Sequence, residues 1–254
     1  MRIAFFGSGA FGLPTIRALH QTCDLVGVVT QPDRPAGRGR TLTPTPIAAW
    51  AAEHTASVPL LKPDRVNQPD VMAEIDRFDA DAWVVIAFGQ KLSETLLAGR
   101  FAINLHASLL PRWRGAAPIN WAIIAGDSHT GNSVITLADR MDAGLVLATS
   151  PPRPIEPDLT TDRLHDQLAD DGPAAVLGVL EQSIRGSLTP AAQDDSLVTH
   201  ARKLSRDDAW IDLCGAADTA RARINGLSPW PGVSATLDGK QFVHMEALIN
   251  SMTP

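Results

Sequence analysis

The chain has 254 residues, 44% hydrophobic and 20% charged, which suits one large domain or a large domain with a small second one. A net charge of −6 argues against a protein covered in nucleic acid, although it leaves room for a local basic site. Cys23 and Cys214 share no disulfide-framework or metal-site spacing, so no metal is expected. No apolar run approaches the roughly 20 residues that span a bilayer, and the opening MRIAFFGSGAFG lacks a signal-peptide cleavage region. We therefore expect a cytoplasmic protein without membrane contact.

Short β-rich runs alternate with helical patterns through most of the chain. This alternation predicts an α/β fold with a Rossmann-like, mostly parallel sheet. The expected strands are Arg2–Phe6, Asp24–Thr30, Ala82–Ala87, Phe101–Leu105, Ser133–Ala138 and Leu145–Thr149. The expected helices end near Leu19 and His54 or span Val66–Phe78, Pro118–Gly126 and Leu159–Ile184, the last with a break at Gly172-Pro173.

The character of the sequence changes after Ile184. Residues 186–203 are polar and loop-like, and a helix over Gly215–Asn225 precedes a predicted hairpin of Val233–Leu237 and Gln241–Met245 around Asp238-Gly239. We expect a first domain over 1–186, a linker over 187–205 and a small C-terminal region over 206–254.

The segment Gln31–Thr43 has two prolines, two glycines and three arginines, and it reads as a long structureless loop. Such a loop in a compact domain usually has a function. Arg34, Arg38 and Arg40 can reach phosphate groups, although a merely solvated basic loop has the same composition.

The residues Gly7–Gly12 form a literal GxGxxG between a predicted strand and a helix, as in dinucleotide-binding proteins. The acidic residue that should follow the next strand is missing, because Asp33 lies beyond a proline inside the loop. A glycine turn for backbone geometry alone is therefore favoured over NAD(P) binding.

One strand carries two chemically useful side chains. Asn104 and His106 lie two apart at the end of Phe101–Leu105, so they point to the same side, at the carboxyl edge where α/β sites lie. A predicted turn between two later strands adds the carboxylate of Asp142. An amide and a protonated imidazole suit the oxyanion of an acyl transfer, and a carboxylate suits removal of an amine proton. A structural histidine and a plain turn aspartate remain alternatives.

The run from Asn104 to Leu147 closely resembles the 10-formyltetrahydrofolate-dependent formyltransferases. Their Asn-x-His, SLLP-type loop and downstream aspartate match Asn104, His106, Ser108–Pro111 and Asp142. The resemblance implies that Asn104 and His106 stabilise the formyl oxyanion and that Asp142 assists His106 and proton transfer. It also implies 10-formyltetrahydrofolate as the formyl-donor co-substrate, in a pocket lined largely by backbone. The folate-binding residues it implies are Phe88, Gly89, Gln90, Leu92, Ser108, Leu109, Leu110 and Pro111.

Three further segments resemble the family members that act on methionyl-tRNA. Thr30–Pro46 is similar to their basic insertion loop, Leu197–Leu213 to their linker and Ser228–Val233 to the start of their C-terminal domain. This implies initiator methionyl-tRNA as the partner of a monomeric enzyme, with Arg34, Arg38 and Arg40 on the tRNA. Phe11 is then a candidate wall for the methionine side chain, with plain core packing as the other interpretation.

Two features depart from that pattern. Asn120-Trp121 is more typical of members that act on sugars or water. The C-terminal region is also too short for a five-stranded OB-like barrel, so an incomplete OB-like β region is expected. The leading alternative is a formyltransferase for a small amine such as an amino sugar nucleotide. A non-catalytic folate- or RNA-binding remnant and an NAD(P) oxidoreductase are the others.

Overall fold

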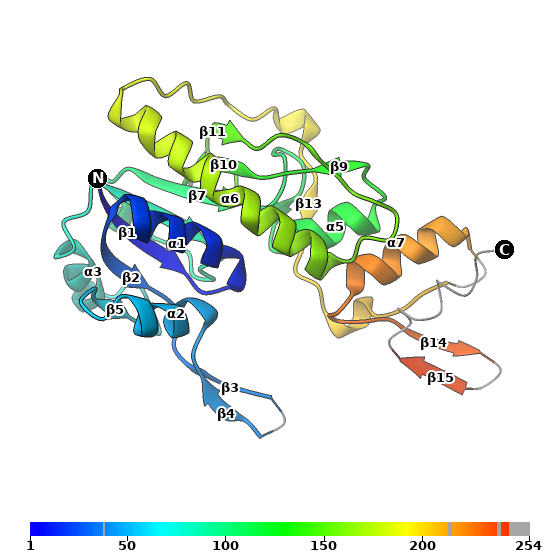
Figure 1. Ribbon diagram of the computed structural model, residues 1–254. Helices are drawn as coiled ribbons and strands as arrows, with labels where there is room; N and C mark the ends of the chain where they lie inside the picture. The colour runs from blue at the N-terminus through cyan, green and yellow to red at the C-terminus, as the bar shows by residue number, and fades with distance from the viewer. Residues whose placement is uncertain (38, 213–214, 238–239, 244–254) are drawn as a thin grey trace.

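A seven-stranded sheet organises the larger part of the molecule (Figure 1). The computed structural model describes residues 1–37, 39–212, 215–237 and 240–243. In spatial order the strands are β11 (Val146–Thr149), β10 (Ser133–Thr136), β7 (Ala102–His106), β6 (Ala82–Ile86), β1 (Arg2–Gly7), β2 (Asp24–Val29) and β5 (Leu60–Leu61). The pairs from β7 to β5 are parallel, and β10 runs antiparallel to both of its neighbours. The predicted mostly parallel sheet is confirmed.

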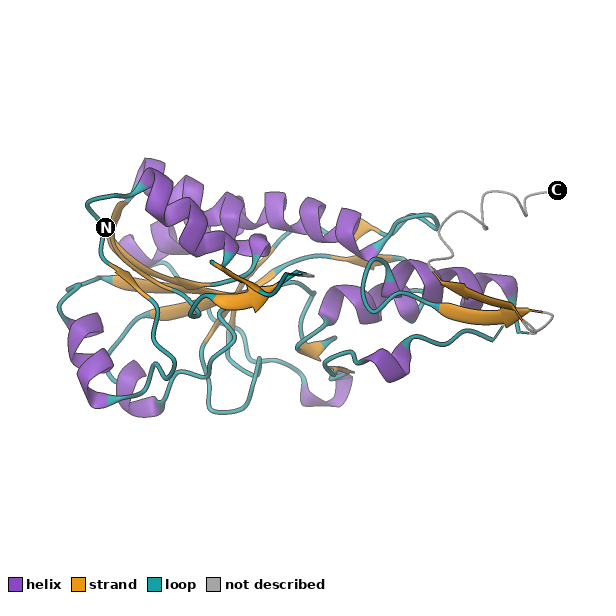
Figure 2. Cartoon of the chain, turned by 90° about the horizontal axis from the view of Figure 1, so that it is seen from below, coloured by secondary structure: helices purple, strands orange, loops and turns teal. Residues whose placement is uncertain are grey.

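Helices cover both faces of this sheet, as the view from below shows (Figure 2). Alternate residues of β1 point to opposite faces. Ile3 and Phe5 enter the core beneath α1 (Leu13–Thr22), α2 (Pro46–His54) and α6 (Thr161–Ile184), whereas Ala4 and Phe6 enter the core beneath α3 (Pro69–Asp76) and α4 (Glu94–Leu97). The continuous apolar strands of the sequence follow from burial on two faces.

The helix α6 does not break at Pro173, contrary to the expectation. A Cβ at Gly172 would lie 2.7 Å from Leu105 Cδ2 and 3.1 Å from Thr15 Oγ1, so the glycine lets the helix approach the sheet and α1 closely. The buried Leu164, Leu168 and Val176 on either side of the proline hold the helix together across it. Their burial offsets the roughly 3 kcal/mol that an internal proline costs.

The basic segment after β2 is an ordered ribbon and not the structureless loop that was expected. β3 (Arg34–Ala36) and β4 (Thr41–Thr43) pair antiparallel and project away from the sheet (Figure 1). Gly37 and Arg40 take positive φ angles of 70° and 49° between the two strands. At its base, Thr30 Oγ1 and Thr45 Oγ1 share a hydrogen bond of 2.6 Å, which fixes the ribbon to β2 and to the first turn of α2.

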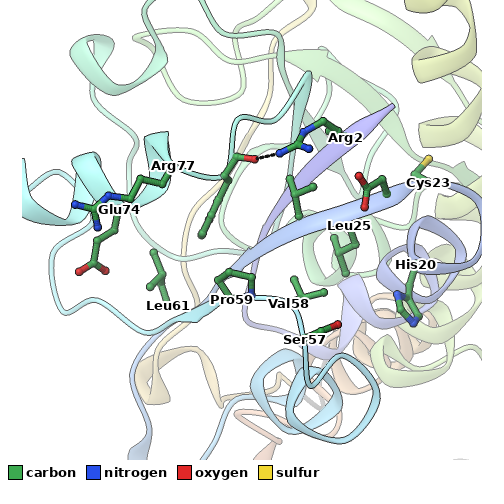
Figure 3. Close-up of a pocket in the computed structure, with 13 residues that line it drawn as sticks. Arg2, His20, Cys23, Leu25, Ser57, Val58, Pro59, Leu61, Glu74 and Arg77 are labelled. Carbon is green, nitrogen blue, oxygen red and sulfur yellow. Dashed lines mark hydrogen bonds between the residues drawn. The ribbon is translucent and has the colours of Figure 1, made fainter.

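A cavity of about 730 Å³ lies at the edge of the sheet where β1 and β2 begin. Arg2, Cys23 and Leu25 form one side of it, and Glu74 of α3 and Arg77 just after that helix form the other (Figure 3). His106 ends its strand at the opposite edge, so this cavity is separate from the candidate site.

The polar stretch after α6 returns to the sheet domain and then leads into a small second core. Here β13 (His200–Ala201) pairs parallel with β8 (Arg114–Gly115), while β9 (His129–Thr130) pairs with β12 (Arg153–Pro154). Short 3-10 turns occupy Ala10–Gly12, Asp195–Leu197 and Arg206–Asp208. The helix α7 (Ala217–Leu227) packs on α5 (Pro118–Ile124), and Leu204, Ile224, Leu227, Val233 and Ala235 form the second core beside Trp121.

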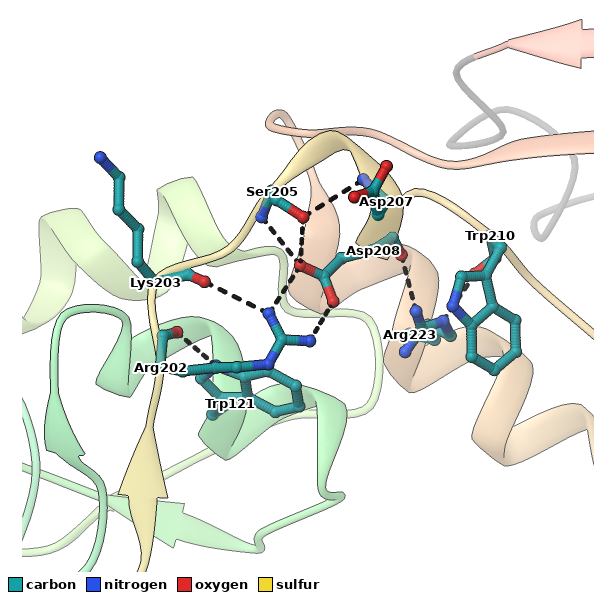
Figure 4. A network of polar contacts seen from close by, with 8 residues as sticks. All are labelled: Trp121, Arg202, Lys203, Ser205, Asp207, Asp208, Trp210 and Arg223. Carbon is teal, nitrogen blue, oxygen red and sulfur yellow. Dashed lines mark hydrogen bonds and ion pairs between the residues drawn. The ribbon is translucent and has the colours of Figure 1, made fainter.

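Asn120 and Trp121, which depart from the sequence pattern of the members that act on methionyl-tRNA, have a structural role at this junction. Asn120 Nδ2 donates to the Gly226 carbonyl at 2.8 Å, and Trp121 Nε1 donates to the Arg202 carbonyl at 2.8 Å. Arg202 in turn stacks on Trp121 and binds Asp208 (Figure 4). The pair thus ties α5 to α7 and to the preceding linker.

The OB-like character of the C-terminal region is not confirmed. Its described residues contain one antiparallel pair, β14 (Ser234–Leu237) with β15 (Lys240–Val243). Asp238, Gly239 and Met245, which belong to the predicted hairpin, lie outside the described residues. Within the part of the chain that is described, no helix has the length and apolar character needed to cross a membrane.

Candidate active site

The strand β7 places the candidate catalytic residues beside the centre of the sheet. Asn104 lies between Val85 of β6 and Ile135 of β10, two residues before His106. Its side chain is half-buried and forms no hydrogen bond within the described residues. An amide held on a rigid strand without a protein partner is free to donate to a bound substrate.

His106 is held through one nitrogen and leaves the other free. The ring is 6% exposed, and Nε2 lies 2.9 Å from the carbonyl oxygen of Trp113. Because a carbonyl can only accept, Nε2 carries a hydrogen. The opposite nitrogen, Nδ1, lies 3.7 Å from Oδ2 of Asp142. That separation exceeds a direct hydrogen bond, so Nδ1 can serve a reacting group.

Asp142 lies in the connection between β10 and β11, as the sequence predicts, and its conformation is unusual. The residue has φ +54°, a left-handed conformation that few side chains adopt, and its side chain is only 13% exposed. Its Oδ2 accepts a hydrogen bond of 2.9 Å from the Gly115 backbone N–H. At Gly144 a Cβ would lie 1.7 Å from the Thr136 carbonyl oxygen, so the turn requires glycine there.

The SLLP segment is part of the scaffold around His106. Ser108 Oγ donates to the Arg112 carbonyl at 2.6 Å, and Ser133 Oγ donates to the Ser108 carbonyl at 2.7 Å. Leu110 N donates back to Ser133 Oγ at 3.0 Å. Leu110 is buried, whereas Leu109 and Pro111 are half-buried. The hydroxyl of Ser108 is therefore engaged, and Leu109 and Pro111 offer the accessible surface of this segment.

The segment after β6 offers mainly backbone. Phe88 is buried against Phe6 and Leu92 is buried in the same core, whereas Ala87 and Gly89 are exposed with φ +47° and +82°. The Gln90 side chain accepts from Val66 N at 2.8 Å and donates to the Pro63 carbonyl at 2.9 Å. Gln90 thus fixes the segment, and its accessible polar groups are those of the main chain.

The residues expected to contact methionyl-tRNA lie either on the exposed ribbon or in the core. Arg34 and Arg40 on the ribbon are exposed, and neither forms an ion pair with another described residue. The neighbouring Asp33 is neutralised by Lys62 at 2.7 Å, so the ribbon keeps its positive charge. Arg38 lies outside the described residues. Phe11 is 6% exposed in the core, with its ring 5.4 Å from that of His165.

The two arginines after the SLLP segment belong to ion pairs. Arg112 binds Asp127 at 2.5 Å, and Arg114 binds Asp195 at 3.0 Å. Both arginines are thus engaged by carboxylates of the protein itself. Among the residues that the structure describes, no group of three His, Cys, Asp or Glu side chains is placed to hold a metal.

Sequence reasoning missed the linker's contribution to this site. Gln193 and Thr199 lie in the polar stretch after α6, yet they contact the turn of Asp142 and the backbone of Trp113. Their placement depends on the two-residue pairing of β13 with β8, which leaves no periodic signal in the sequence.

Comparisons with known proteins agree with this architecture. A family model described as formyl transferase matches residues 1–180. The methionyl-tRNA formyltransferase of Sorangium cellulosum is 40% identical over 253 residues, which cover 99% of this chain and 80% of that protein. A 4-N formyltransferase from Francisella tularensis superimposes with a TM-score of 0.73 at 13% identity, covering 95% of each chain. HypX from Aquifex aeolicus, in complex with tetrahydrofolic acid, superimposes with a TM-score of 0.69 at 18% sequence identity, over 95% of this chain and 36% of that one.

The fold is thus that of an α/β group-transfer enzyme with its polar residues gathered at the carboxyl edge of the sheet. More specifically, the chain belongs to the formyltransferase family and is an enzyme of that family. Members of this family take their formyl group from 10-formyltetrahydrofolate, so the donor expected from the sequence is confirmed.

Proposed function

We propose that this enzyme transfers the formyl group of 10-formyltetrahydrofolate to the α-amino group of initiator methionyl-tRNA. The observation that carries the proposal is the arrangement of three groups: the Asn104 amide and Nδ1 of His106, neither of which has a hydrogen bond to a described residue, and Asp142 Oδ2 at 3.7 Å from Nδ1. Methionyl-tRNA is proposed as the acceptor because the relatives at about 40% identity are named methionyl-tRNA formyltransferase.

The chemistry assigns a role to each of these groups. The amine nitrogen attacks the formyl carbon, and the carbonyl electron pair moves onto oxygen to give a tetrahedral oxyanion. The Asn104 amide and a protonated Nδ1 of His106 donate hydrogen bonds to that oxygen. Asp142 accepts the proton that the amine loses, directly or through a water. The carbonyl then re-forms, the bond from carbon to N10 of the folate breaks, and N10 takes up the proton held by Asp142 as it leaves.

The residues present fit a reduced folate. After β6, Phe88 is turned into the core while the main chain of Ala87 and Gly89 remains exposed. A pteridine, which carries its own donors and acceptors, can bind such a backbone without charged side chains. Met141 and Leu145, exposed on either side of the Asp142 turn, add apolar surface next to it.

The ribbon supports an RNA acceptor. Arg34 and Arg40 are exposed on a narrow projection, with no ion-pair partner among the residues that the structure describes, and Asp33 beside them is neutralised by Lys62. Free guanidinium groups on such a projection can contact phosphates beyond the edge of the globular domain. The alternative acceptor, a small amine such as an amino sugar nucleotide, is not favoured, because a sugar N-formyltransferase from Shewanella is only 13% identical to this chain, whereas the methionyl-tRNA formyltransferases are about 40% identical.

The test is formyl transfer to charged initiator methionyl-tRNA at low and moderate salt, with an amino sugar nucleotide as the second acceptor. We expect turnover with methionyl-tRNA that weakens as salt rises, because phosphate contacts release counterions. Turnover with the sugar nucleotide alone would overturn the proposal in favour of the small-amine enzyme. Donor binding without turnover on either acceptor would favour a non-catalytic remnant.

A further inference from the structure

The turn that carries Asp142 needs support from outside itself. A non-glycine residue at φ +54° is strained, and such a conformation persists only where the surroundings hold it. Within the connection, the Ala143 N–H donates to the Arg140 carbonyl at 3.2 Å and the Leu145 N–H donates to Thr136 Oγ1 at 2.9 Å, but neither bond engages the carbonyl of Asp142 or of Gly144. The Gly115 N–H holds one carboxylate oxygen, but it does not hold the backbone.

Gln193 of the linker supplies that backbone contact. Its Nε2 donates two hydrogen bonds of 2.8 Å, one to the Asp142 carbonyl and one to the Gly144 carbonyl. Both hydrogens of one amide group are thus used on the two carbonyls around the turn. This clamp sets the direction in which Asp142 leaves the backbone, and hence its 3.7 Å approach to Nδ1 of His106.

Arg114 sets the direction of the Gln193 amide. The arginine side chain is 3% exposed, and its Nε donates to Gln193 Oε1 at 2.8 Å. Since a guanidinium has no acceptor, it selects the oxygen of the amide and turns the NH2 group toward the Asp142 turn. Asp195, two residues after Gln193, binds Nη2 of the same guanidinium at 3.0 Å.

The same linker also positions the other partner of the pair. Thr199 Oγ1 accepts from Trp113 N at 2.9 Å, and the Thr199 carbonyl accepts from Arg114 N at 3.0 Å. Trp113 is the residue whose carbonyl orients His106. Residues 193–199 therefore hold the backbones on both sides of the His106–Asp142 pair, although they lie beyond the residues matched by the family model.

We propose that Gln193, oriented by Arg114, is a positioning residue for the formyl-transfer reaction, acting through the Asp142 turn. The inference rests on the proposed function, because it assumes that Asp142 takes part in the reaction. It assigns to the linker a direct part in building the catalytic centre.

The test is a mutational cycle in the full chain. Gln193→Met keeps an unbranched side chain and removes both donors. We expect kcat to fall about 10- to 100-fold, since a misplacement of about 1 Å can cost 100-fold, with both KM values within about threefold of the parent. In an Asp142→Asn background the same change should lower kcat by no more than about threefold, because Gln193 acts through that carboxylate. Gln21→Met, at an exposed glutamine of α1, is the matched control and should behave as the parent.

The outcomes separate this inference from the proposed function. A parent enzyme that does not formylate methionyl-tRNA contradicts the proposed function itself. An active parent with an unchanged kcat in Gln193→Met, or with the full loss repeated on top of Asp142→Asn, overturns the positioning role alone. Should Gln193→Met melt early, Gln193→Glu replaces it, because it keeps an acceptor for Arg114 and still lacks both donors. A parent-like kcat in Gln193→Glu would equally overturn the inference.

Discussion

The carbonyl oxygen of Trp113 lies 2.9 Å from Nε2 of His106, and this contact decides which ring nitrogen is available for chemistry. With Nε2 engaged, Nδ1 alone faces Asp142 and the side of β7 that carries Asn104. The imidazole cannot rotate to offer its other nitrogen without losing a hydrogen bond in a buried setting, at a cost of about 1–3 kcal/mol.

We expect the three residues of this site to be individually required. His106→Ala, Asp142→Asn and Asn104→Ala should each lower kcat at least about 100-fold, as removal of an oxyanion donor or a proton acceptor does. Asp142→Asn is the sharpest of the three, because its remaining oxygen can still accept from Gly115 N and the turn should persist. Steady-state formylation of methionyl-tRNA measures the effect, with His129→Ala at an exposed site as control. Near-normal turnover in any one of the three would contradict the role given to that residue.

The ribbon should act on tRNA affinity and not on chemistry. We expect Arg34→Ala and Arg40→Ala to raise KM for methionyl-tRNA severalfold and to flatten its dependence on salt, since each removes about one phosphate contact. Turnover at saturating tRNA should stay within about twofold of the parent. The matched control is Arg17→Ala on α1, at another exposed arginine that forms no ion pair within the described part of the chain. An unchanged salt slope in both ribbon variants would show that the ribbon does not reach phosphate.

Much of the fold follows from local pattern. The apolar runs of β1, β6 and β7 are buried on both faces, so their composition alone identifies them. The spacing of Asn104 and His106 places both on one side of a strand without further information. For Asp142 the sequence predicts a turn between two later strands, but its pairing with His106 rests mainly on the family motif, because no local rule brings a turn 36 residues away back to that ring.

The errors arise where contacts are distant in sequence. Gln193 contacts a turn 51 positions earlier, and its linker is anchored by a strand pair of two residues on each side. The ribbon was missed because Pro35 and the glycines resemble a loop, whereas the cross-strand pairing of Arg34 with Thr43 is what orders it. At Pro173 the burial of α6 overrides a local helix-breaking signal.

An ion pair spans the two segments proposed to hold the folate. Lys91, after β6, binds Asp139, after β10, at 2.6 Å, and the hydrogen bond and charge of Lys91 hold the pKa of Asp139 below its usual value. Breaking the pair through Lys91→Ala should raise KM for 10-formyltetrahydrofolate about two- to fivefold, a small effect because solvent screens an exposed ion pair. The ratio of this KM in Lys91→Ala to that in the parent should stay constant from pH 6 to 8, since Asp139 remains ionised throughout. Arg185→Ala, which breaks the exposed pair with Glu181 on α6, serves as control. A KM unchanged by Lys91→Ala would mean that this pair does not shape the folate pocket.

The junction between the two cores should be sensitive to pH through Asp208 (Figure 4). This carboxylate accepts from both terminal guanidinium nitrogens of Arg202, Nη1 and Nη2, and from the Ser205 N–H, and these contacts hold its pKa well below the usual value. Asp208→Asn should therefore lower the free energy of unfolding at pH 7 by about 2 kcal/mol, as for a hydrogen bond to a charged group. A lowered pKa stabilises the fold fully above the ordinary value near 3.9, and the contribution is lost as pH falls further. Urea unfolding of the variant and the parent should thus differ at pH 7 and converge progressively below about pH 4. Asp207→Asn, an exposed neighbour whose carboxylate has no described partner, should match the parent at every pH. A difference between Asp208→Asn and the parent that stays constant down to pH 2.5 would mean that the ionised carboxylate is not what secures the junction.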